Sequence, residues 1–329
     1  MNPCILQVYG IAKRFGGVQA VHPLSFEVRP GEIFGFLGPN GAGKTTTLRM
    51  LMGITAPDSG TLRFEGGRRL DRARVGYLPE ERGLFEDAPV LETVVYLGEL
   101  RGMTRTAARA AAVPLLKRLD LGGRLQEKVN TLSKGNQQKV QLAGAILHAP
   151  VLAVLDEPFA GLDPVNQELF VSLMREMRDR GSSVLLSAHQ LDLVERVADR
   201  FLVISAGREL LCGTLEQIRR ITSGGVADIV QLHLAPLDSV PFAAEPLRAR
   251  LAELLHGGSA ELRDVAPASA RLDLWLPAGT DLGPLLVAAA QSACLVRVET
   301  RPLSLHEIYL RSIRAMGGLV TEEEVTHET

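Results

Sequence analysis

The stretch that decides the fold is Gly38-Pro39-Asn40-Gly41-Ala42-Gly43-Lys44-Thr45. A glycine, four intervening residues and then Gly-Lys-Thr is the spacing of a loop whose backbone N–H groups point inward at phosphate oxygens. The apolar run 33–37 before the loop predicts a strand, and a helix is expected over 44–53 directly after it. Because a helix N-terminus also attracts anions, the stretch predicts a nucleotide site.

The residues of this loop are expected to have different roles. Lys44 is expected to reach the β- and γ-phosphates, and the Thr45 hydroxyl is expected to hold Mg²⁺. The loop alone leaves kinases, GTPases and ATPases as alternatives. The full set of expected nucleotide contacts in this stretch is Gly38, Pro39, Asn40, Gly41, Ala42, Gly43, Lys44, Thr45 and Thr46.

Two carboxylates follow the continuous apolar run 151–155. Such a run is typical of a parallel strand that is buried on both faces, and the carboxyl end of such a strand meets the ligand edge of the sheet. Asp156 is therefore expected to bind Mg²⁺ through water. Glu157, one residue further along, is expected to polarise the attacking water.

Three further stretches resemble motifs of the ABC ATPases. Leu132-Ser133-Lys134-Gly135-Asn136-Gln137-Gln138-Lys139 resembles the family's signature, Ala160-Gly161-Leu162-Asp163-Pro164 its D-loop and Ser187-Ala188-His189-Gln190 its switch-histidine loop. Phe15, within Lys13-Arg14-Phe15-Gly16-Gly17, occupies the place of the family's adenine-stacking aromatic residue. The motifs occur in family order and cover about residues 4 to 220.

The resemblance implies an ATP site with Mg²⁺ that forms between two ATPase domains arranged head to tail. One domain supplies the phosphate loop, and the other supplies Ser133 and the Gly135 N–H to cap the γ-phosphate. His189 resembles the residue that hydrogen-bonds the γ-phosphate, and together with Glu157 and Lys44 it is expected to be catalytic. Asp163 resembles the residue that communicates between the two sites.

Two departures from the family pattern bear on the subgroup. Glu80 stands where most ABC ATPases have glutamine, and its carboxylate is expected to be a third Mg²⁺ ligand beside Thr45 and Asp156. Lys134 and Asn136 stand where glycine and glutamine are more common in the signature. Both departures resemble the pattern of one ABC ATPase subgroup. Its members serve exporters that have separate membrane subunits, and they include the sodium-efflux and drug-efflux ATPases.

The expected fold class is α/β: a P-loop NTPase core of the ABC type with an inserted helical subdomain, followed by a small α+β ferredoxin-like domain. Residues 1–220 are expected to form the nucleotide-binding domain, with the helical subdomain at about 88–145. Within that subdomain, residues from about 90 to 129 are expected to be helical throughout. Beyond a break near 221–225, the accessory domain is expected to extend to residue 318, with the order β-α-β-β-α-β followed by a helix. The expected elements are strand 228–234, helix 246–256, strand 260–265, strand 270–276, helix 282–292, strand 294–300 and helix 304–315. The remaining residues, 319–329, are expected to be an acidic tail.

The last helix pattern begins with Ser304, and Glu307 is placed to complete a capping box. The stretch Pro302-Leu303-Ser304-Leu305-His306-Glu307-Ile308-Tyr309 also resembles the closing motif of the exporter subgroup's accessory domain. Because no catalytic cluster is apparent after Gly225, regulation or dimer support is the expected role of this part.

Composition excludes several other classes of protein. The 329 residues carry 36 Lys and Arg against 38 Asp and Glu, so no basic excess predicts nucleic-acid binding. Three scattered cysteines predict neither a disulfide framework nor a metal knuckle. No apolar run approaches the roughly 18 residues of a membrane helix, and the N-terminus does not resemble a signal peptide. The chain is therefore expected neither to cross a membrane nor to be exported.

The leading functional hypothesis is the ATP-hydrolysing subunit that powers an ABC exporter. The resemblance implies three further features: a second copy or a homologous ATPase subunit as partner, a separate transmembrane permease, and a location at the cytoplasmic face of the cell membrane. Non-transport ABC ATPases of DNA repair or translation remain an alternative, but Lys44 and Ser133 are only 89 positions apart, with no coiled-coil pattern between them. An importer ATPase remains a nearer alternative.

Overall fold

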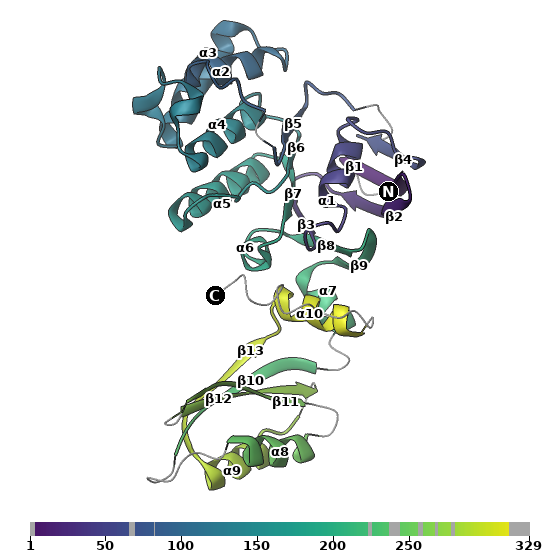
Figure 1. The fold of residues 1–329 in the computed structure, drawn as a ribbon, viewed down its shortest axis with the longest axis vertical. Helices are drawn as coiled ribbons and strands as arrows, with labels where there is room; N and C mark the ends of the chain where they lie inside the picture. Colours follow the sequence, from purple (N-terminus) through teal and green to yellow (C-terminus); the bar gives the residue numbers. More distant parts are fainter. Residues whose placement is uncertain are drawn as a thin grey trace. The chain divides into compact units, whose positions relative to one another are not determined.

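The computed structural model divides into two compact units, Met1–Leu215 and Glu216–Thr329 (Figure 1). It describes residues 4–65, 70–81, 83–222, 226–236, 244–255, 259–266, 269–277 and 280–315. The expected acidic tail at 319–329 lies outside the described residues. Among the helices that are described, none combines the length and the apolar character needed to cross a bilayer.

A six-stranded sheet forms the centre of the first unit. Its strand order is β5 (Val75–Leu78), β6 (Leu152–Leu155), β7 (Ser183–Ala188), β3 (Ile33–Leu37), β8 (Arg200–Ser205) and β9 (Arg208–Gly213). The first five strands are parallel, whereas β9 pairs antiparallel with β8. Every residue of β3 and β6 is buried, which explains why both strands are continuous apolar runs in the sequence.

An antiparallel sheet packs against this parallel one. It consists of β1 (Leu6–Phe15), β2 (Val18–Val28) and β4 (Ser59–Phe64), in the order β2-β1-β4. The Phe26 ring from this sheet stacks on Phe34 and Phe36 of β3, with ring centroids 5.7 and 5.9 Å apart. One apolar core therefore joins the two sheets.

Helices connect the strands of the parallel sheet. The helices of the first unit are α1 (Lys44–Leu51), α2 (Val90–Glu99), α3 (Arg105–Arg118), α4 (Lys134–Ile146), α5 (Pro164–Asp179) and α6 (Leu191–Glu195), and α7 (Leu215–Thr222) follows them. The sequence predicts continuous helix over 90–129, but Gly102 at φ 89° interrupts it and Thr104 caps the new helix by accepting a hydrogen bond from the Ala107 N–H. Short 3₁₀ turns replace helix at Gly122–Arg124 and Val129–Thr131.

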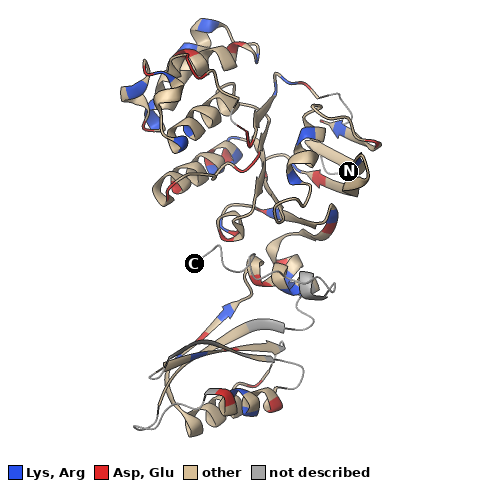
Figure 2. Ribbon diagram, viewed as in Figure 1, with Lys and Arg blue, Asp and Glu red and all other residues tan. Residues whose placement is uncertain are grey.

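Basic and acidic positions both occur along the helices of the first unit (Figure 2). Two arginines of α3 pair with glutamates of other helices: Arg109 Nη1 lies 2.7 Å from Glu92 Oε1 of α2, and Arg118 pairs with Glu176 of α5. Partly exposed pairs of this kind contribute about 0–1 kcal/mol each. The fully buried side chains of α2, α3 and α4 are therefore the main source of stability for this helical region.

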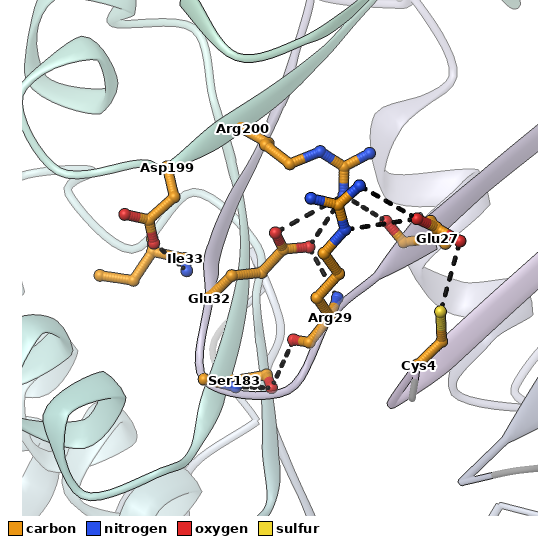
Figure 3. Close-up of polar contacts among 9 residues, drawn as sticks. Cys4, Glu27, Arg29, Glu32, Ile33, Ser183, Asp199 and Arg200 are labelled. Carbon is orange, nitrogen blue, oxygen red and sulfur yellow. Dashed lines mark hydrogen bonds and ion pairs between the residues drawn. The ribbon is translucent and has the colours of Figure 1, made fainter. Parts of the chain in front are cut away.

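A buried polar network surrounds Glu32, which directly precedes β3 and therefore lies at the end of the strand opposite the phosphate loop (Figure 3). The Glu32 carboxylate accepts hydrogen bonds from the Arg29 N–H at 2.7 Å and from Arg200 Nη1 at 3.1 Å. The Ser183 hydroxyl donates to the Arg29 carbonyl at 2.9 Å and accepts from the Gly31 N–H at 3.0 Å. These bonds fix the turn that leads from β2 into β3.

We expect Arg200→Met to lower the free energy of unfolding by about 2 kcal/mol, because it leaves the buried Glu32 carboxylate without its cationic partner. Denaturant titration measures this loss. The matched control is Arg196→Met, which breaks an exposed pair with Glu168 and should cost less than about 1 kcal/mol. Equal losses in the two variants would contradict a structural role for the network.

The second unit is a four-stranded antiparallel sheet with helices. Its elements in chain order are β10 (Val226–Ala235), α8 (Ala244–Leu254), β11 (Ser259–Ala266), β12 (Ser269–Pro277), α9 (Gly283–Ser292), β13 (Cys294–Pro302) and α10 (Leu305–Ala315). The strand order is β11-β12-β10-β13, and all neighbours are antiparallel. Buried leucines on one face of the sheet pack against α8 and α9. The order of elements expected from the sequence is confirmed.

The capping box expected at the start of α10 is present. The Glu307 N–H donates to the Ser304 hydroxyl at 3.2 Å, and the Ser304 N–H donates to Glu307 Oε2 at 2.9 Å. Burial alone would raise the pKa of Glu307, but the hydrogen bonds and charge of Arg301 together with those of Ser304 outweigh it, so the pKa lies below its usual range. Glu307 therefore remains ionised and anchors this helix terminus.

Candidate nucleotide-hydrolysis site

Four adjacent parallel strands have their carboxyl ends on the same side of the central sheet, and each leads into a residue that is expected at the site. Strand β3 runs into the phosphate loop, β6 into Asp156 and Glu157, β7 into His189 and β5 into Glu80. This edge is where ligands bind in open α/β sheets. A cavity of about 250 Å³ lies there, lined by Ala20, Pro39, Asn40, Gly41, Gly43, Lys44, Thr45, Thr46, Glu80 and Glu157.

The loop requires glycine at two positions. Gly43, at φ 100°, precedes α1, and a Cβ there would lie 2.6 Å from the Ala20 carbonyl oxygen. A Cβ on Gly38 would lie 2.4 Å from the carbonyl oxygen of Ile204. Within α1, all of whose residues are described, no side chain caps the first turn and no acidic residue lies in it. The N–H groups of that turn are therefore available to an anion.

Lys44 is held inside the loop with its charge against Glu157. Its Nζ donates to the carbonyl oxygens of Gly38 at 2.7 Å and Pro39 at 3.3 Å, and lies 3.4 Å from Glu157 Oε1. Only 6% of Lys44 is exposed. The ammonium group is thus fixed inside the loop that is expected to bind the phosphates.

Glu157 occupies a strained and well-anchored position. Its φ of 48° lies in the left-handed region, and its N–H donates to the Ser187 hydroxyl at 2.9 Å. His189 Nδ1 donates to Glu157 Oε2 at 2.9 Å. Burial would raise the pKa of Glu157, but this hydrogen bond and the Lys44 charge hold it below the usual range. The carboxylate is therefore ionised at neutral pH and can accept a proton.

Asp156, Thr45 and Glu80 supply oxygen atoms suited to Mg²⁺. The Ser187 hydroxyl donates to Asp156 Oδ1 at 2.6 Å, while the buried Oδ2 has no hydrogen-bond partner among the described residues. Burial raises the pKa of Asp156, and the Ser187 hydrogen bond opposes that shift. The Thr45 hydroxyl donates to Glu80 Oε2 at 3.1 Å. An orphaned carboxylate oxygen beside a hydroxyl and a second carboxylate fits a hard cation that completes its shell with phosphate and water.

The remaining expected site residues lie outside this cavity. Ser133 is exposed and caps its own helix, α4, by accepting a hydrogen bond from the Asn136 N–H. A Cβ on Gly135 would lie 3.2 Å from the Gly161 carbonyl oxygen, so the signature and the D-loop lie side by side. The exposed Asp163 caps α5. These residues are therefore separate from the lining of the cavity at the phosphate loop.

Phe15 is also separate from the cavity lining. It is 52% exposed, and Lys13 Nζ lies 5.6 Å from its ring centroid. Its expected role in adenine stacking stays a prediction.

The sequence motifs predict no role for Ser187, whose hydroxyl donates a hydrogen bond to Asp156 and accepts one from the Glu157 N–H. The motifs also predict no role for Gln138 and Gln141 of α4. Their side-chain amides donate hydrogen bonds to the loops that carry Glu157 and Glu80. A signal for Ser187 is its hydroxyl directly after the apolar run 184–186 of β7, close to the carboxyl end of the strand. The glutamines carry no such local signal, because helices commonly contain glutamine on exposed faces.

Comparisons with known proteins agree with this geometry. The profile of the ABC transporter family matches residues 21–160. An uncharacterised ABC transporter ATP-binding protein of Methanocaldococcus jannaschii is 42% identical over 220 residues, which cover 67% of this chain and 81% of that protein. The Nod factor export ATP-binding protein I of Paraburkholderia xenovorans is 41% identical over 208 residues, which cover 62% of this chain and 68% of that protein.

Solved structures agree as well. One described as the ATP-binding subunit of an ABC transporter superposes with a TM-score of 0.62 and 32% identity, over 66% of this chain and 92% of that one. ABC ATP-binding proteins bind ATP and are ATPases. From the sequence relationship, the shared fold and the phosphate loop, the chain belongs to the family of ABC transporter ATP-binding proteins, and its role is that of the ATP-binding subunit.

Proposed function

We propose that this chain hydrolyses ATP with Mg²⁺ in the cavity at the phosphate loop and thereby powers export through a separate membrane permease. The observation that carries the proposal is that Lys44 and Glu157 line one 250 Å³ cavity with their charged groups 3.4 Å apart, while the residue before Glu157, Asp156, keeps a buried oxygen without a partner among the described residues. The N–H groups of α1 and the Lys44 ammonium group bind the phosphates and oppose their charge. This arrangement is the one that phosphoryl transfer to water requires.

The remaining residues orient the attacking water and the metal. Glu157 accepts a proton from the water, and His189 holds the Glu157 carboxylate in place through the 2.9 Å hydrogen bond and contacts the γ-phosphate. Thr45, Asp156 and Glu80 are the residues that would hold Mg²⁺. When bound, Mg²⁺ neutralises the charge on the phosphate oxygens. Phe15 is proposed to stack on adenine.

We propose that the complete hydrolytic site contains two chains arranged head to tail. Ser133, Gly135 and Asp163 do not line the cavity of their own chain. Ser133 and Asp163 are exposed, Gly135 is partly exposed, and Gly135 lies beside Gly161 of the D-loop. The α4 N-terminus that Ser133 caps can bind an anion that approaches from outside. A second copy, or a homologous ATPase subunit, would therefore supply this cluster to the nucleotide.

The direction of transport is proposed to be export. The Nod factor export ATP-binding protein, 41% identical, supports this direction, as do Lys134 and Asn136 of the signature. A gene for a membrane permease beside the gene of this chain would support export further, whereas a gene for an extracellular substrate-binding protein would contradict it. Through that permease, the chain is proposed to lie at the cytoplasmic face of the membrane.

The finer fold assignment is also a proposal. We propose that α2, α3 and α4 form the helical subdomain inserted between β5 and β6, at about 88–145. The antiparallel order β11-β12-β10-β13 supports a ferredoxin-like domain at about 221–318, after a nucleotide-binding domain at 1–220. The role proposed for this domain is regulation or dimer support.

The test of the nucleotide site is Lys44→Ala. We expect this change to weaken the binding of a fluorescent ATP analogue by about 10- to 100-fold, because charged hydrogen bonds to phosphate contribute roughly 1.5–3 kcal/mol. Lys128→Ala is the matched control, since Lys128 is exposed and lies outside the cavity. Unchanged affinity of Lys44→Ala would remove the basis for placing the phosphates in this loop.

A further inference from the structure

Two buried glutamines on one face of α4 donate hydrogen bonds to the loops that carry Glu80 and Glu157. Gln138 is 3% exposed and Gln141 is 5% exposed. They are three positions apart on the helix, so their side chains lie on the same face, one turn apart. Neither residue lines the cavity.

Gln141 holds the backbone on both sides of Glu80. Its side-chain Nε2 donates to the carbonyl oxygen of Pro79 at 2.9 Å and to that of Glu81 at 3.2 Å. Glu80, the residue between them, accepts the Thr45 hydroxyl with its own carboxylate. A single amide group therefore fixes the short loop from which this carboxylate projects.

Gln138 acts in the same way on the loop after β6. Its Nε2 donates to the carbonyl oxygens of Glu157 at 3.4 Å and Pro158 at 3.2 Å. The Glu157 backbone is in the left-handed region, which a residue with a side chain keeps only when its surroundings hold it there. Gln138 on the carbonyl side and Ser187 on the N–H side provide that support.

We propose that Gln141 and Gln138 are positioning residues, through which α4 sets the places of the Glu80 and Glu157 carboxylates. This inference rests on the proposed function of the site. Helix α4 begins directly after Ser133, which is proposed to meet the nucleotide of the other chain. Gln141 lies eight residues further on, about 12 Å along the helix axis. One rigid helix thus joins the contact with the partner's nucleotide to the two acidic loops of its own site.

The experiment uses Gln141→Met and Gln138→Met, which keep side-chain length and remove the amide donor. We expect Gln141→Met to lower kcat about tenfold, as outer-shell substitutions at metal sites do, with KM within twofold because the phosphate loop is untouched. Its affinity for Mn²⁺ in the presence of a non-hydrolysable ATP analogue should fall by a similar factor. Mn²⁺ prefers the same oxygen ligands as Mg²⁺, and EPR measures its free concentration.

Gln138→Met is expected to lower kcat by a similar factor and to leave Mn²⁺ affinity within twofold of wild type, because Glu157 is not among the proposed metal ligands. A merely structural role would move all of these parameters together. The stability control is Ser182→Ala, which removes a side-chain donor to the Pro150 carbonyl at the opposite edge of the sheet and should change neither kcat nor Mn²⁺ affinity.

If Gln141→Met lowers the melting temperature strongly, Gln141→Asn replaces it, since the shorter amide is retained but cannot reach both carbonyls. Wild-type kcat and Mn²⁺ affinity in a folded Gln141 variant would overturn the inference, and so would equal Mn²⁺ losses in both glutamine variants. Failure of the proposed function is a different result, because there the wild-type chain itself neither binds the analogue nor hydrolyses ATP.

Discussion

Glu157→Gln is expected to slow ATP hydrolysis by about 10²–10⁴-fold while ATP binding persists, because general-base catalysis contributes about that factor. The replacement has the same shape and removes the charge that can accept a proton. It also removes a negative charge 3.4 Å from Lys44, which leaves that ammonium group free for the phosphates. ATP should therefore be trapped, and the variant should accumulate as a dimer. Single-turnover hydrolysis and size-exclusion chromatography measure the two effects.

The matched control for this prediction is Glu168→Gln, an isosteric change at a half-exposed carboxylate of α5 that pairs with Arg196. Its turnover should equal that of wild type. If Glu157→Gln itself retained wild-type turnover, the proton acceptor would have to lie elsewhere. His189, whose side chain is 49% exposed, would then be the next residue to replace.

Features that depend on local sequence were predicted well. The phosphate loop needs only glycines, a lysine and a threonine at fixed spacing, and its neighbours in the fold do not alter that requirement. In the second unit, the predicted helix 282–292 appears as Gly283–Ser292 and the predicted strand 270–276 as Ser269–Pro277. Sustained periodicity and clear breaks made these elements visible.

Strands with irregular pairing were missed. Strand β1 is Leu6–Phe15, but its register with β2 shifts between Val8 and Ile11 and twice more before Phe15. Each shift interrupts the alternation of inward and outward side chains on which a strand prediction depends. Strand β9 was missed as well, because it lies at the edge of the sheet, where four of its six residues are partly or fully exposed.

The hydrogen bonds that support the site residues could not be predicted from the sequence. Ser187 reaches Asp156 across 31 positions, and Gln141 reaches Pro79 across 62 positions. No spacing rule links such pairs, since the sheet order and the placement of α4 bring them together only in three dimensions. The motif predicts which groups carry the chemistry, whereas the fold determines what holds them.

The signature serine allows a test of whether one chain or two form the site. If Ser133 only capped its own helix, Ser133→Arg should cost about 1 kcal/mol of stability and leave ATPase activity intact. If it meets the partner's γ-phosphate, the arginine should block dimer closure and abolish steady-state hydrolysis, with ATP affinity of the monomer nearly unchanged. Thr104→Arg is the matched control, because Thr104 is an exposed N-cap of α3 outside the signature.

Mixing two inactive variants tests the head-to-tail arrangement directly. Ser133→Arg chains keep an intact phosphate loop, and Lys44→Ala chains keep an intact signature. A heterodimer of the two therefore contains one intact composite site and one that carries both changes, whereas each variant alone contains none. We expect partial recovery of ATPase activity on mixing, measured as phosphate release against the mixing ratio. Full activity of Ser133→Arg alone would contradict the composite site, because it would show that each chain hydrolyses ATP without the signature of a partner.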